Sequence, residues 1–246
     1  MLALGYRLLL SQVYFGWEES DFGNLAMIKG VVDHGFVQYD MNHLPMYYFL
    51  GGVVMSAVGD AATAGLIVSM GSGVLTVVLG TLLAIQIGGR RAGWVAAILL
   101  VFQPELALYS ASTLREPVYA VAVLACLLSL VRERLFWASW FAGVAFLTRM
   151  DALLILGPVL AIHALGGRDP IRRSLFALGP LFFSVAGWSL YCGLHPEYQT
   201  FAFWGHSVAV NLETGGGTGE ASTLAWAADG AGVAADEGRG CLGDRR

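Results

Sequence analysis

The chain has 246 residues, of which 57% are hydrophobic and 13% are charged, and its mean hydropathy is +0.65. Soluble domains carry about 25% charged residues, so this composition excludes a water-soluble globule and an intrinsically disordered chain. The formal net charge of −4 excludes the basic face of a nucleic-acid-binding protein, and we expect no nucleic-acid partner. The composition predicts an all-α protein, a polytopic transmembrane helical bundle whose solvent is the lipid bilayer.

The N-terminal quarter is predicted to hold an incomplete membrane helix followed by interfacial helices in a first external loop. Residues 1–16 contain polar side chains and fall short of the about 20 residues that a spanning helix needs. We therefore expect them to be the remaining part of a first membrane helix. Apolar positions within 20–33 have the spacing of a helix that lies in the interface. The apolar stretch 44–59 is interrupted by Gly51–Gly52 and is either a further span or a second interfacial helix.

Six further apolar runs follow, and we expect each of them to cross the membrane. They cover residues 62–87, 92–110, 117–131, 135–149, 151–166 and 174–193. If 44–59 does not span, alternate connections carry most of the arginines, which the positive-inside rule assigns to the cytoplasmic side: Arg90, Arg91, Arg132, Arg134, Arg168, Arg172 and Arg173. Most of the acids then lie on the opposite face. We expect a multi-pass protein of the cell (inner) membrane whose polar chemistry is external.

The end of the chain differs in composition from the rest. Residues 213–246 have no hydrophobic periodicity and are rich in Gly, Ala, Thr and acids, so they cannot bury a core. We expect either a disordered tail or an aberrant end at which the reading frame departs from the parent sequence. The transmembrane domain is accordingly predicted to cover residues 1–212.

Two polar stretches in the predicted first external loop are candidates for chemistry. Glu18, Glu19 and Asp21 place three carboxylates within four residues, and carboxylates are a residue type that acid–base catalysis uses. The alternative for them is an ordinary acidic loop with a helix N-cap. Further on, His43 is placed to reach a phosphate or a metal. The neighbouring pair Tyr47–Tyr48 is typical of aromatic anchoring at the membrane interface.

Three more polar stretches lie between or after the predicted spans. Arg115 and Glu116 precede a proline at an external corner and are either functional residues or part of a surface loop. Arg149 and Asp151 lie between two apolar runs with almost no loop. Charge at membrane depth is a functional hypothesis by default, and a structural ion pair is the alternative. His206 follows two aromatic residues beyond the last span.

In this order, the polar stretches resemble motifs of the membrane-embedded glycosyltransferases of the C-type fold, in particular the protein O-mannosyltransferase and lipid A aminoarabinose transferase group (glycosyltransferase family 39). The family pattern D-E-x-x-Y-x-x-x-A is similar to residues 18–26. Its P-x-x-Y-Y stretch is similar to 45–48, with one residue fewer between the proline and the tyrosine pair. Its corner with an acid before proline resembles 115–117, and its Leu-Thr-Arg/Lys corner resembles 147–149. The resemblance extends over about residues 17–207.

The resemblance implies an activity and a role for each candidate residue. Family members transfer a sugar from a polyprenyl-phosphate carrier to an acceptor lipid, glycan or protein on the outer face, and they invert the anomeric carbon. The implied catalytic residues are Glu18 or Asp21 as general base, with Glu19 beside them. The implied substrate-binding residues are Arg149 on the carrier phosphate, with Arg115 or Lys29, and in addition His43, Glu116 and His206. The resemblance also favours an interfacial helix at 44–59.

Other features depart from the family or leave alternatives open. The leading acid is Glu18 where the family has Asp, so the base is either Glu18 or Asp21. No metal site or cofactor is assigned, although the outer acids with His43 or His206 could recruit a divalent metal. Family members are longer, and we expect this chain to be the N-terminal catalytic part of a larger protein. The alternative functions are a transporter or lipid-carrier flippase, and an inactive truncated membrane subunit.

Overall fold

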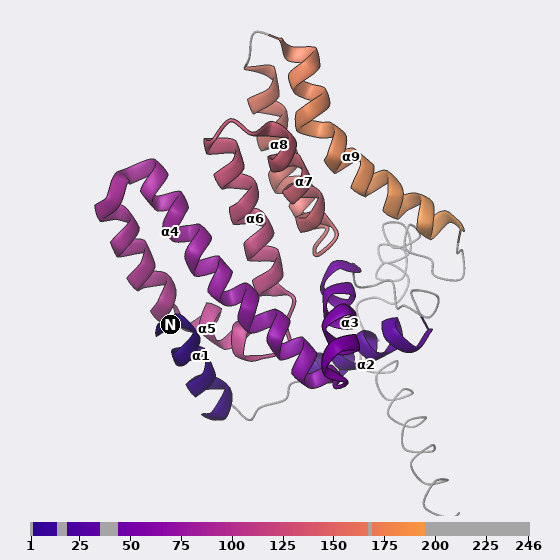
Figure 1. The fold of residues 1–246 in the computed structure, drawn as a ribbon. Coiled ribbons are helices and arrows are strands. Elements are labelled where there is room, and N and C mark those ends of the chain that lie inside the picture. The colour runs from indigo at the N-terminus through magenta and orange to yellow at the C-terminus, as the bar shows by residue number, and fades with distance from the viewer. Residues whose placement is uncertain (1, 14–18, 35–43, 167–168, 195–246) are drawn as a thin grey trace, which may run out of the picture. The chain divides into compact units, whose positions relative to one another are not determined.

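The computed structural model of the protein describes residues 2–13, 19–34, 44–166 and 169–194. Every helix or strand in these ranges is an α-helix, which confirms the predicted all-α class for this part of the chain (Figure 1). By its internal contacts the chain divides after Gln199, and all the helices below belong to the first unit. The predicted tail at 213–246 lies outside the described residues.

Three short helices make up the N-terminal part. Helix α1 covers Leu2–Val13, α2 covers Glu19–His34 and α3 covers Met46–Val58. The bounds of α2 and α3 agree within a few residues with the two helices predicted for the first external loop. Gly59 ends α3 with a φ of 79°, the left-handed conformation that commonly terminates a helix.

Helices α2 and α3 pack closely because two consecutive glycines of α3 face α2. A Cβ atom at Gly51 would lie 2.7 Å from Cγ1 of Ile28, and one at Gly52 would lie 3.0 Å from Cγ1 of Val31. Ile28 is fully buried in this contact. The two glycines that interrupt the apolar stretch in the sequence are therefore the surface on which α2 packs.

The longest helix, α4 (Ala61–Phe102), is a hairpin of two helical limbs. Gly89, at the bend, has φ 76° and ψ −175°, a conformation that glycine adopts far more readily than other residues. Leu100 of the second limb lies against Gly80 of the first, and Figure 1 shows the chain doubling back. The predicted break between the first two apolar runs is thus confirmed, with Arg90–Arg91 at the bend.

The apolar run 92–110, which the sequence predicts as one membrane span, contains two helices. Helix α4 ends at Phe102, and a separate helix, α5, covers Pro104–Ala111. Proline cannot donate the next helical hydrogen bond, and it disfavours helical geometry in the preceding residue. Gln103 is accordingly extended, with φ −64° and ψ 115°. Its side chain caps α5 by accepting a hydrogen bond from the N–H of Leu106.

Helices α6 (Glu116–Val131) and α7 (Leu135–Phe146) are joined by a tight turn. Glu133 has a φ of 56°, and the N–H of Arg134 donates to the carbonyl of Ser129 over 2.8 Å. This long hydrogen bond around a left-handed residue is the Schellman pattern that ends many helices. The turn therefore separates the third and fourth apolar runs where the sequence predicts a connection.

The last two helices are α8 (Asp151–Leu165) and α9 (Pro170–Leu194), and α9 begins about one turn earlier than predicted. Pro180 lies inside α9, where it disturbs the backbone hydrogen-bond ladder. The next residue, Leu181, donates its N–H to Oγ of Ser139 on α7 over 3.0 Å. A hydroxyl on the neighbouring helix thus satisfies a backbone donor beside the proline.

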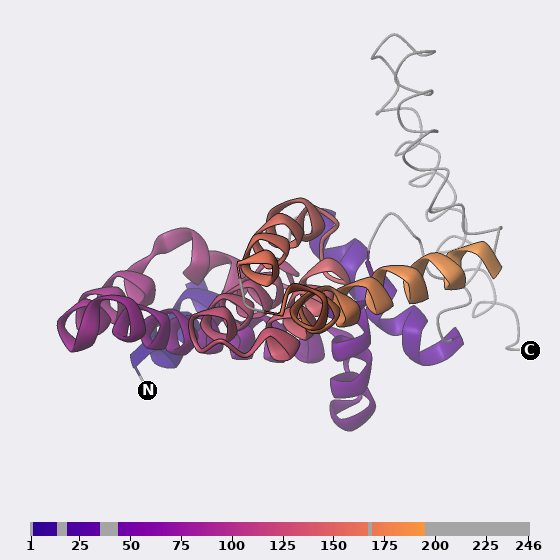
Figure 2. The same cartoon turned by 90° about the horizontal axis from the view of Figure 1, so that it is seen from above.

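Helices α4, α6, α7 and α9 pack one against the next, and α8 packs on α7 and α9; Figure 2 shows the same packing from above. The core face of α7 carries small residues, and Ala138, Ala142 and Ala145 are fully buried. Small residues let helix backbones approach closely. In Figure 1 the bend of α4, the α6–α7 turn and the start of α9 lie at one end, and the α5–α6 and α7–α8 corners lie toward the other.

Two of the described helices are long and apolar enough to cross a membrane, judged by length and composition. They are Ala61–Phe102 and Pro170–Tyr191, with mean hydropathies of 2.1 and 1.4 in their most apolar windows. Large apolar side chains such as Trp94 (66% exposed), Ile162 (72%) and Phe182 (72%) project outward, as they do on surfaces that face lipid or a partner. These features support membrane association. The shorter apolar helices are Leu2–Ser11, Met46–Val58, Glu116–Val131, Leu135–Phe146 and Asp151–Leu165.

Candidate functional site

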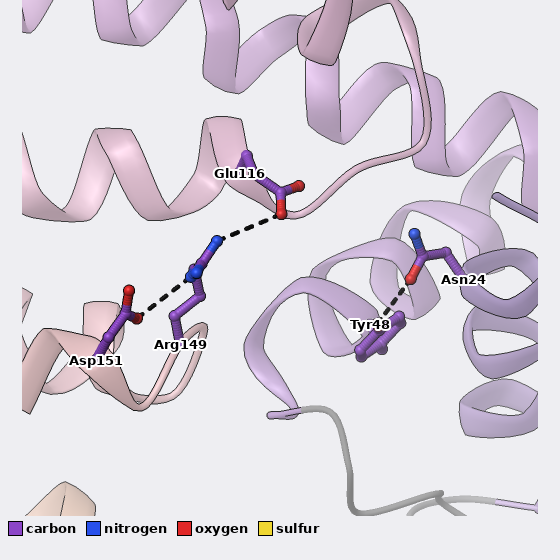
Figure 3. Close-up of polar contacts among 5 residues, drawn as sticks. All are labelled: Asn24, Tyr48, Glu116, Arg149 and Asp151. Carbon is purple, nitrogen blue, oxygen red and sulfur yellow. Dashed lines mark hydrogen bonds and ion pairs between the residues drawn. The ribbon is translucent and has the colours of Figure 1, made fainter. Parts of the chain in front are cut away.

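A guanidinium group lies between two carboxylates at the corner where α7 meets α8 (Figure 3). Nη1 of Arg149 is 3.6 Å from Oε1 of Glu116, and its Nε is 3.2 Å from Oδ1 of Asp151. The guanidinium carbon also lies 5.5 Å from the ring centre of Tyr119, within the range of a cation–π interaction. We call these four residues the arginine cluster.

The helix ends determine the geometry of the arginine cluster. Glu116 and Asp151 are the first residues of α6 and α8, where the helix dipole favours a negative charge. Tyr119 follows Glu116 by one helical turn and so lies on the same face of α6. The N–H of Arg149 donates to the carbonyl of Ala145 over 2.8 Å. This bond ties the α7–α8 corner to the end of α7.

The cluster is open to a ligand and has unused hydrogen-bonding capacity. The side chains of Arg149, Glu116 and Asp151 are 37%, 32% and 45% exposed. Oε2 of Glu116 is buried and has no hydrogen-bond partner within the described part of the chain. A buried acceptor without a donor costs about 1–3 kcal/mol. A ligand hydroxyl that donated to this oxygen would remove that cost.

The two tyrosines of α3 are buried, so their prediction as interfacial anchors is wrong. Tyr47 and Tyr48 are both 0% exposed. The hydroxyl of Tyr48 donates to Oδ1 of Asn24 over 2.7 Å (Figure 3). Nδ2 of Asn24 donates to the carbonyl of Thr113 over 2.8 Å. One tyrosine thus connects α3 through α2 to the α5–α6 corner. Protein groups satisfy its hydroxyl in place of lipid headgroups.

Tyr47 makes a second connection to the same corner. Its hydroxyl lies 3.3 Å from Oγ of Ser69 on α4, and Oγ of Ser69 donates to the carbonyl of Leu114 over 3.0 Å. The backbone N–H of Met46 donates to the carbonyl of Leu147 over 3.0 Å, so the start of α3 also contacts the α7–α8 corner. Helix α3 therefore contacts both corners from which the arginine cluster is built.

These contacts bring together four of the five stretches on which the glycosyltransferase resemblance depends. The described part of the first stretch contributes Asn24, and the second contributes the tyrosine pair. The third contributes Thr113 and Glu116, and the fourth contributes Leu147 and Arg149. The stretches are up to 125 residues apart along the chain (Asn24 to Arg149). Helix packing alone makes them neighbours.

Other predicted site residues are not part of this group. Lys29 is exposed on α2 and Arg115 is half-buried at the start of α6, and no ion pair in the described structure joins either one to Glu116 or Asp151. Glu18, His43 and His206 lie outside the described residues. Glu19 and Asp21 lie on α2, but their side chains are not described. The described residues contain no group of three or more potential metal ligands.

Three residues of this site are absent from the sequence-based prediction. Asn24 lies inside the quoted motif 18–26 but at one of its variable positions, which carries no sequence signal. Ser69 lies in an apolar run, where the sequence gives no reason to single it out. Tyr119 could have been found, because a residue three positions after Glu116 lies on the same helical face.

The arginine cluster is suited to binding a phosphate group near other polar groups of a substrate. A guanidinium can donate two parallel hydrogen bonds to phosphate oxygens. Because Arg149 is more than a third exposed, a phosphate can approach it without unfolding the corner. The two carboxylates keep the guanidinium in one place before a ligand binds, and such preorganisation lowers the entropic cost of binding.

The chain was compared with known protein families, curated proteins and solved structures. No family model, no curated protein and no solved structure matches it.

Proposed function

We propose that the protein is an integral-membrane glycosyltransferase. In this proposal it moves a sugar from a polyprenyl-phosphate carrier to an acceptor hydroxyl on the external (periplasmic or luminal) face of the membrane. The observation that carries the proposal is the arrangement around Arg149. A half-exposed guanidinium lies between Glu116 and Asp151, at the place where the motifs of the resemblance meet.

The proposed reaction accounts for the residue types at the site. The acceptor hydroxyl loses its proton to a carboxylate, Glu18 or Asp21, and its oxygen forms a bond to the anomeric carbon from the face opposite the leaving group. The bond from that carbon to the phosphate oxygen breaks, and its electron pair remains on the phosphate. The carrier phosphate therefore gains one negative charge during the reaction. Arg149 binds this charge more strongly than it binds the ground state, which lowers the barrier.

The surrounding structure supports this assignment to Arg149 over the other cations. Of the three cations proposed for the phosphate, Arg149 alone has ion pairs in the described structure that hold its guanidinium. Oε1 of Glu116 faces the guanidinium, and Oε2 of the same carboxylate has no hydrogen-bond partner in the described structure. We assign it to a hydrogen bond from a sugar hydroxyl, because a sugar on the carrier is attached directly to the phosphate.

The test uses membrane vesicles from cells that produce the full chain. The vesicles receive undecaprenyl phosphate that carries radiolabelled mannose or aminoarabinose, and the label that reaches acceptors is measured over time. We expect transfer above the level of vesicles without the chain. We expect Arg149→Gln to slow transfer by about 10²–10³-fold, the loss typical of one transition-state donor. Arg149→Lys, which keeps the charge but not the two parallel hydrogen bonds, should restore part of the rate.

The matched control is Arg90→Gln, which removes an exposed arginine at the bend of α4 and should leave the rate unchanged. Glu18→Gln and Asp21→Asn identify the base, and unchanged transfer in both variants contradicts a carboxylate base at this position. Movement of the labelled carrier across the bilayer without transfer supports the flippase alternative. Absence of both activities supports the inactive subunit.

A further inference from the structure

Three arginines line an open cavity at the end of the helices opposite the arginine cluster. The cavity has a volume of about 630 Å³ and lies between the α6–α7 turn and the first turns of α9. Arg134 comes from the turn, and Arg172 and Arg173 come from α9, while Glu133 and Asp169 lie at the same cavity. These are residues that the positive-inside rule places on the cytoplasmic side, and the proposed transfer reaction does not use them.

Within the described residues, neither carboxylate of the cavity forms an ion pair with its arginines, and the three arginines outnumber the two carboxylates. The ion pairs within 4.0 Å in the described part of the chain both belong to Arg149, so neither Glu133 nor Asp169 forms one with an arginine here. Nε of Arg173 is buried and has no hydrogen-bond partner in the described structure. Its Nη2 donates weakly to the carbonyl of His163 over 3.4 Å. The cavity thus holds cationic donors that an anion can still use.

The remaining walls of the cavity are aromatic and exposed. Phe136, Trp137 and Phe176 line it, and they are 46%, 49% and 45% exposed. The rings of Phe136 and Phe176 meet edge to face with centroids 6.4 Å apart. The guanidinium of Arg172 lies 5.9 Å from the ring centre of Phe176. Exposed aromatic rings beside basic side chains are typical of the level at which lipid headgroups meet the acyl chains.

We propose that this cavity binds the phosphate headgroup of an anionic phospholipid from the cytoplasmic leaflet. Three features favour a lipid over a soluble anion: the aromatic walls, the open side of the cavity, and its location at the start of α9, one of the two helices long enough to span. The guanidinium groups bind the phosphodiester, and the aromatic rings contact the glycerol and upper acyl region. This inference depends on the proposed membrane location, but not on sugar transfer.

The test measures lipid retention by native mass spectrometry of the full chain in detergent. Phosphatidylglycerol and phosphatidylcholine of equal chain length are titrated separately, and inorganic phosphate is added in a third arm. We expect tighter binding of phosphatidylglycerol. The double variant Arg172→Gln/Arg173→Gln should weaken that binding by about 30-fold, since each basic residue near an anionic surface contributes about fivefold. Phosphatidylcholine binding should change little.

Two further variants separate a built site from general charge attraction. Arg90→Gln/Arg91→Gln removes two exposed arginines at the bend of α4 and should leave phosphatidylglycerol binding intact. Glu133→Gln removes a negative charge from the cavity and should tighten binding, a gain that misfolding cannot mimic. Equal losses in the two double variants, or complete displacement of the lipid by inorganic phosphate, would overturn the proposal. Because no sugar donor is present, the result does not depend on the proposed transferase activity.

Discussion

Arg149 is expected to matter for chemistry far more than for stability. Its side chain and those of Glu116 and Asp151 are all at least about a third exposed, so water screens both ion pairs. Exposed ion pairs contribute about 0–1 kcal/mol to folding. In the proposed reaction, the contact of the same guanidinium with the transition state contributes about 2.7–4 kcal/mol, the value typical of one such donor. The two roles can therefore be separated by experiment.

We predict that Arg149→Gln lowers the free energy of unfolding by no more than about 1 kcal/mol. The measurement is the loss of helical circular dichroism on heating the detergent-solubilised chain, with Arg90→Gln as the exposed control. A midpoint shift as large as that of a buried core substitution would instead assign Arg149 a structural role. The transfer assay and the unfolding assay together then decide between the two roles.

The Tyr48–Asn24 hydrogen bond is expected to contribute to stability, because both residues are buried. Tyr48→Phe leaves Oδ1 of Asn24 without its 2.7 Å hydrogen bond, and we predict a loss of about 1–3 kcal/mol in unfolding free energy. A double-mutant cycle with Asn24→Ala measures the coupling. If the Tyr48 hydroxyl and the Asn24 amide stabilise the fold through their hydrogen bond, the double variant loses less unfolding free energy than the two single variants lose together. Additive losses would show that the bond does not contribute.

Asp60 gives the start of α4 a dependence on pH. Hydrogen bonds from Thr63, first that of its side chain and then that of its backbone N–H, lower the pKa of the Asp60 carboxyl. A carboxyl whose pKa is lower in the folded state stabilises it above the unfolded pKa, near about 4, and loses this effect as the pH falls through the folded value. We predict that Asp60→Ala unfolds more easily than the unsubstituted chain at neutral pH. Thermal midpoints of the two proteins should converge at low pH. A difference that stays constant with pH contradicts a stabilising role of the Asp60 carboxylate as the N-cap of α4.

At the scale of the helix pair α2–α3, glycine is required for space. Gly51→Val places methyl groups where Ile28 already lies, and overpacking of this kind costs about 1–3 kcal/mol. Ile28→Ala in the same chain removes the obstructing atoms. We therefore predict that the double variant is more stable than Gly51→Val alone, as measured by thermal unfolding.

Gly71→Val is the matched control for Gly51→Val. Gly71 lies within a helix, and a Cβ atom there would meet nothing within 4 Å. This control should lose no stability, because valine has a slightly higher helix propensity than glycine. A loss equal to that of Gly51→Val would mean that a cause other than the contact with Ile28 produces the effect.

At the scale of the whole molecule, helix length is the main constraint on the proposed multi-pass topology. The first limb of α4, residues 61–88, is about 40 Å long at 1.5 Å per residue and exceeds the about 30 Å hydrocarbon core. Helices α6, α7 and α8 have 16, 12 and 15 residues and are shorter than that core. A multi-pass topology therefore requires a locally thinned bilayer around them.

Cysteine labelling in intact cells tests the multi-pass topology. The native cysteines are replaced by serine, and single cysteines are introduced at Asp33 and Glu105 on the predicted external side or at Arg90 and Glu133 on the predicted cytoplasmic side; all four residues are exposed. A membrane-impermeant maleimide should label the first two positions in intact cells and the second two only after lysis. Labelling of all four in intact cells contradicts the alternating topology.

Local features were predicted well because they depend on neighbouring residues. The all-α class, the helices near 20–33 and 44–59, and the breaks at the basic turns follow from hydropathy and from glycine and arginine positions. The run 92–110 contains two helices because Pro104 disfavours helical geometry in Gln103. The burial of Tyr47 and Tyr48 was missed because an aromatic pair before an apolar run has the same sequence at an interface and in a core.

By itself, the sequence determined the helical class, the apolar character of the exposed surfaces, and the expected separation of basic from acidic connections between the apolar runs. These properties sum over nearby residues and need no information about packing. Only the tertiary structure decided that Arg149 meets Glu116, and that Asn24 and Tyr48 connect to Thr113. Those contacts join positions far apart in the chain, which helix packing brings together.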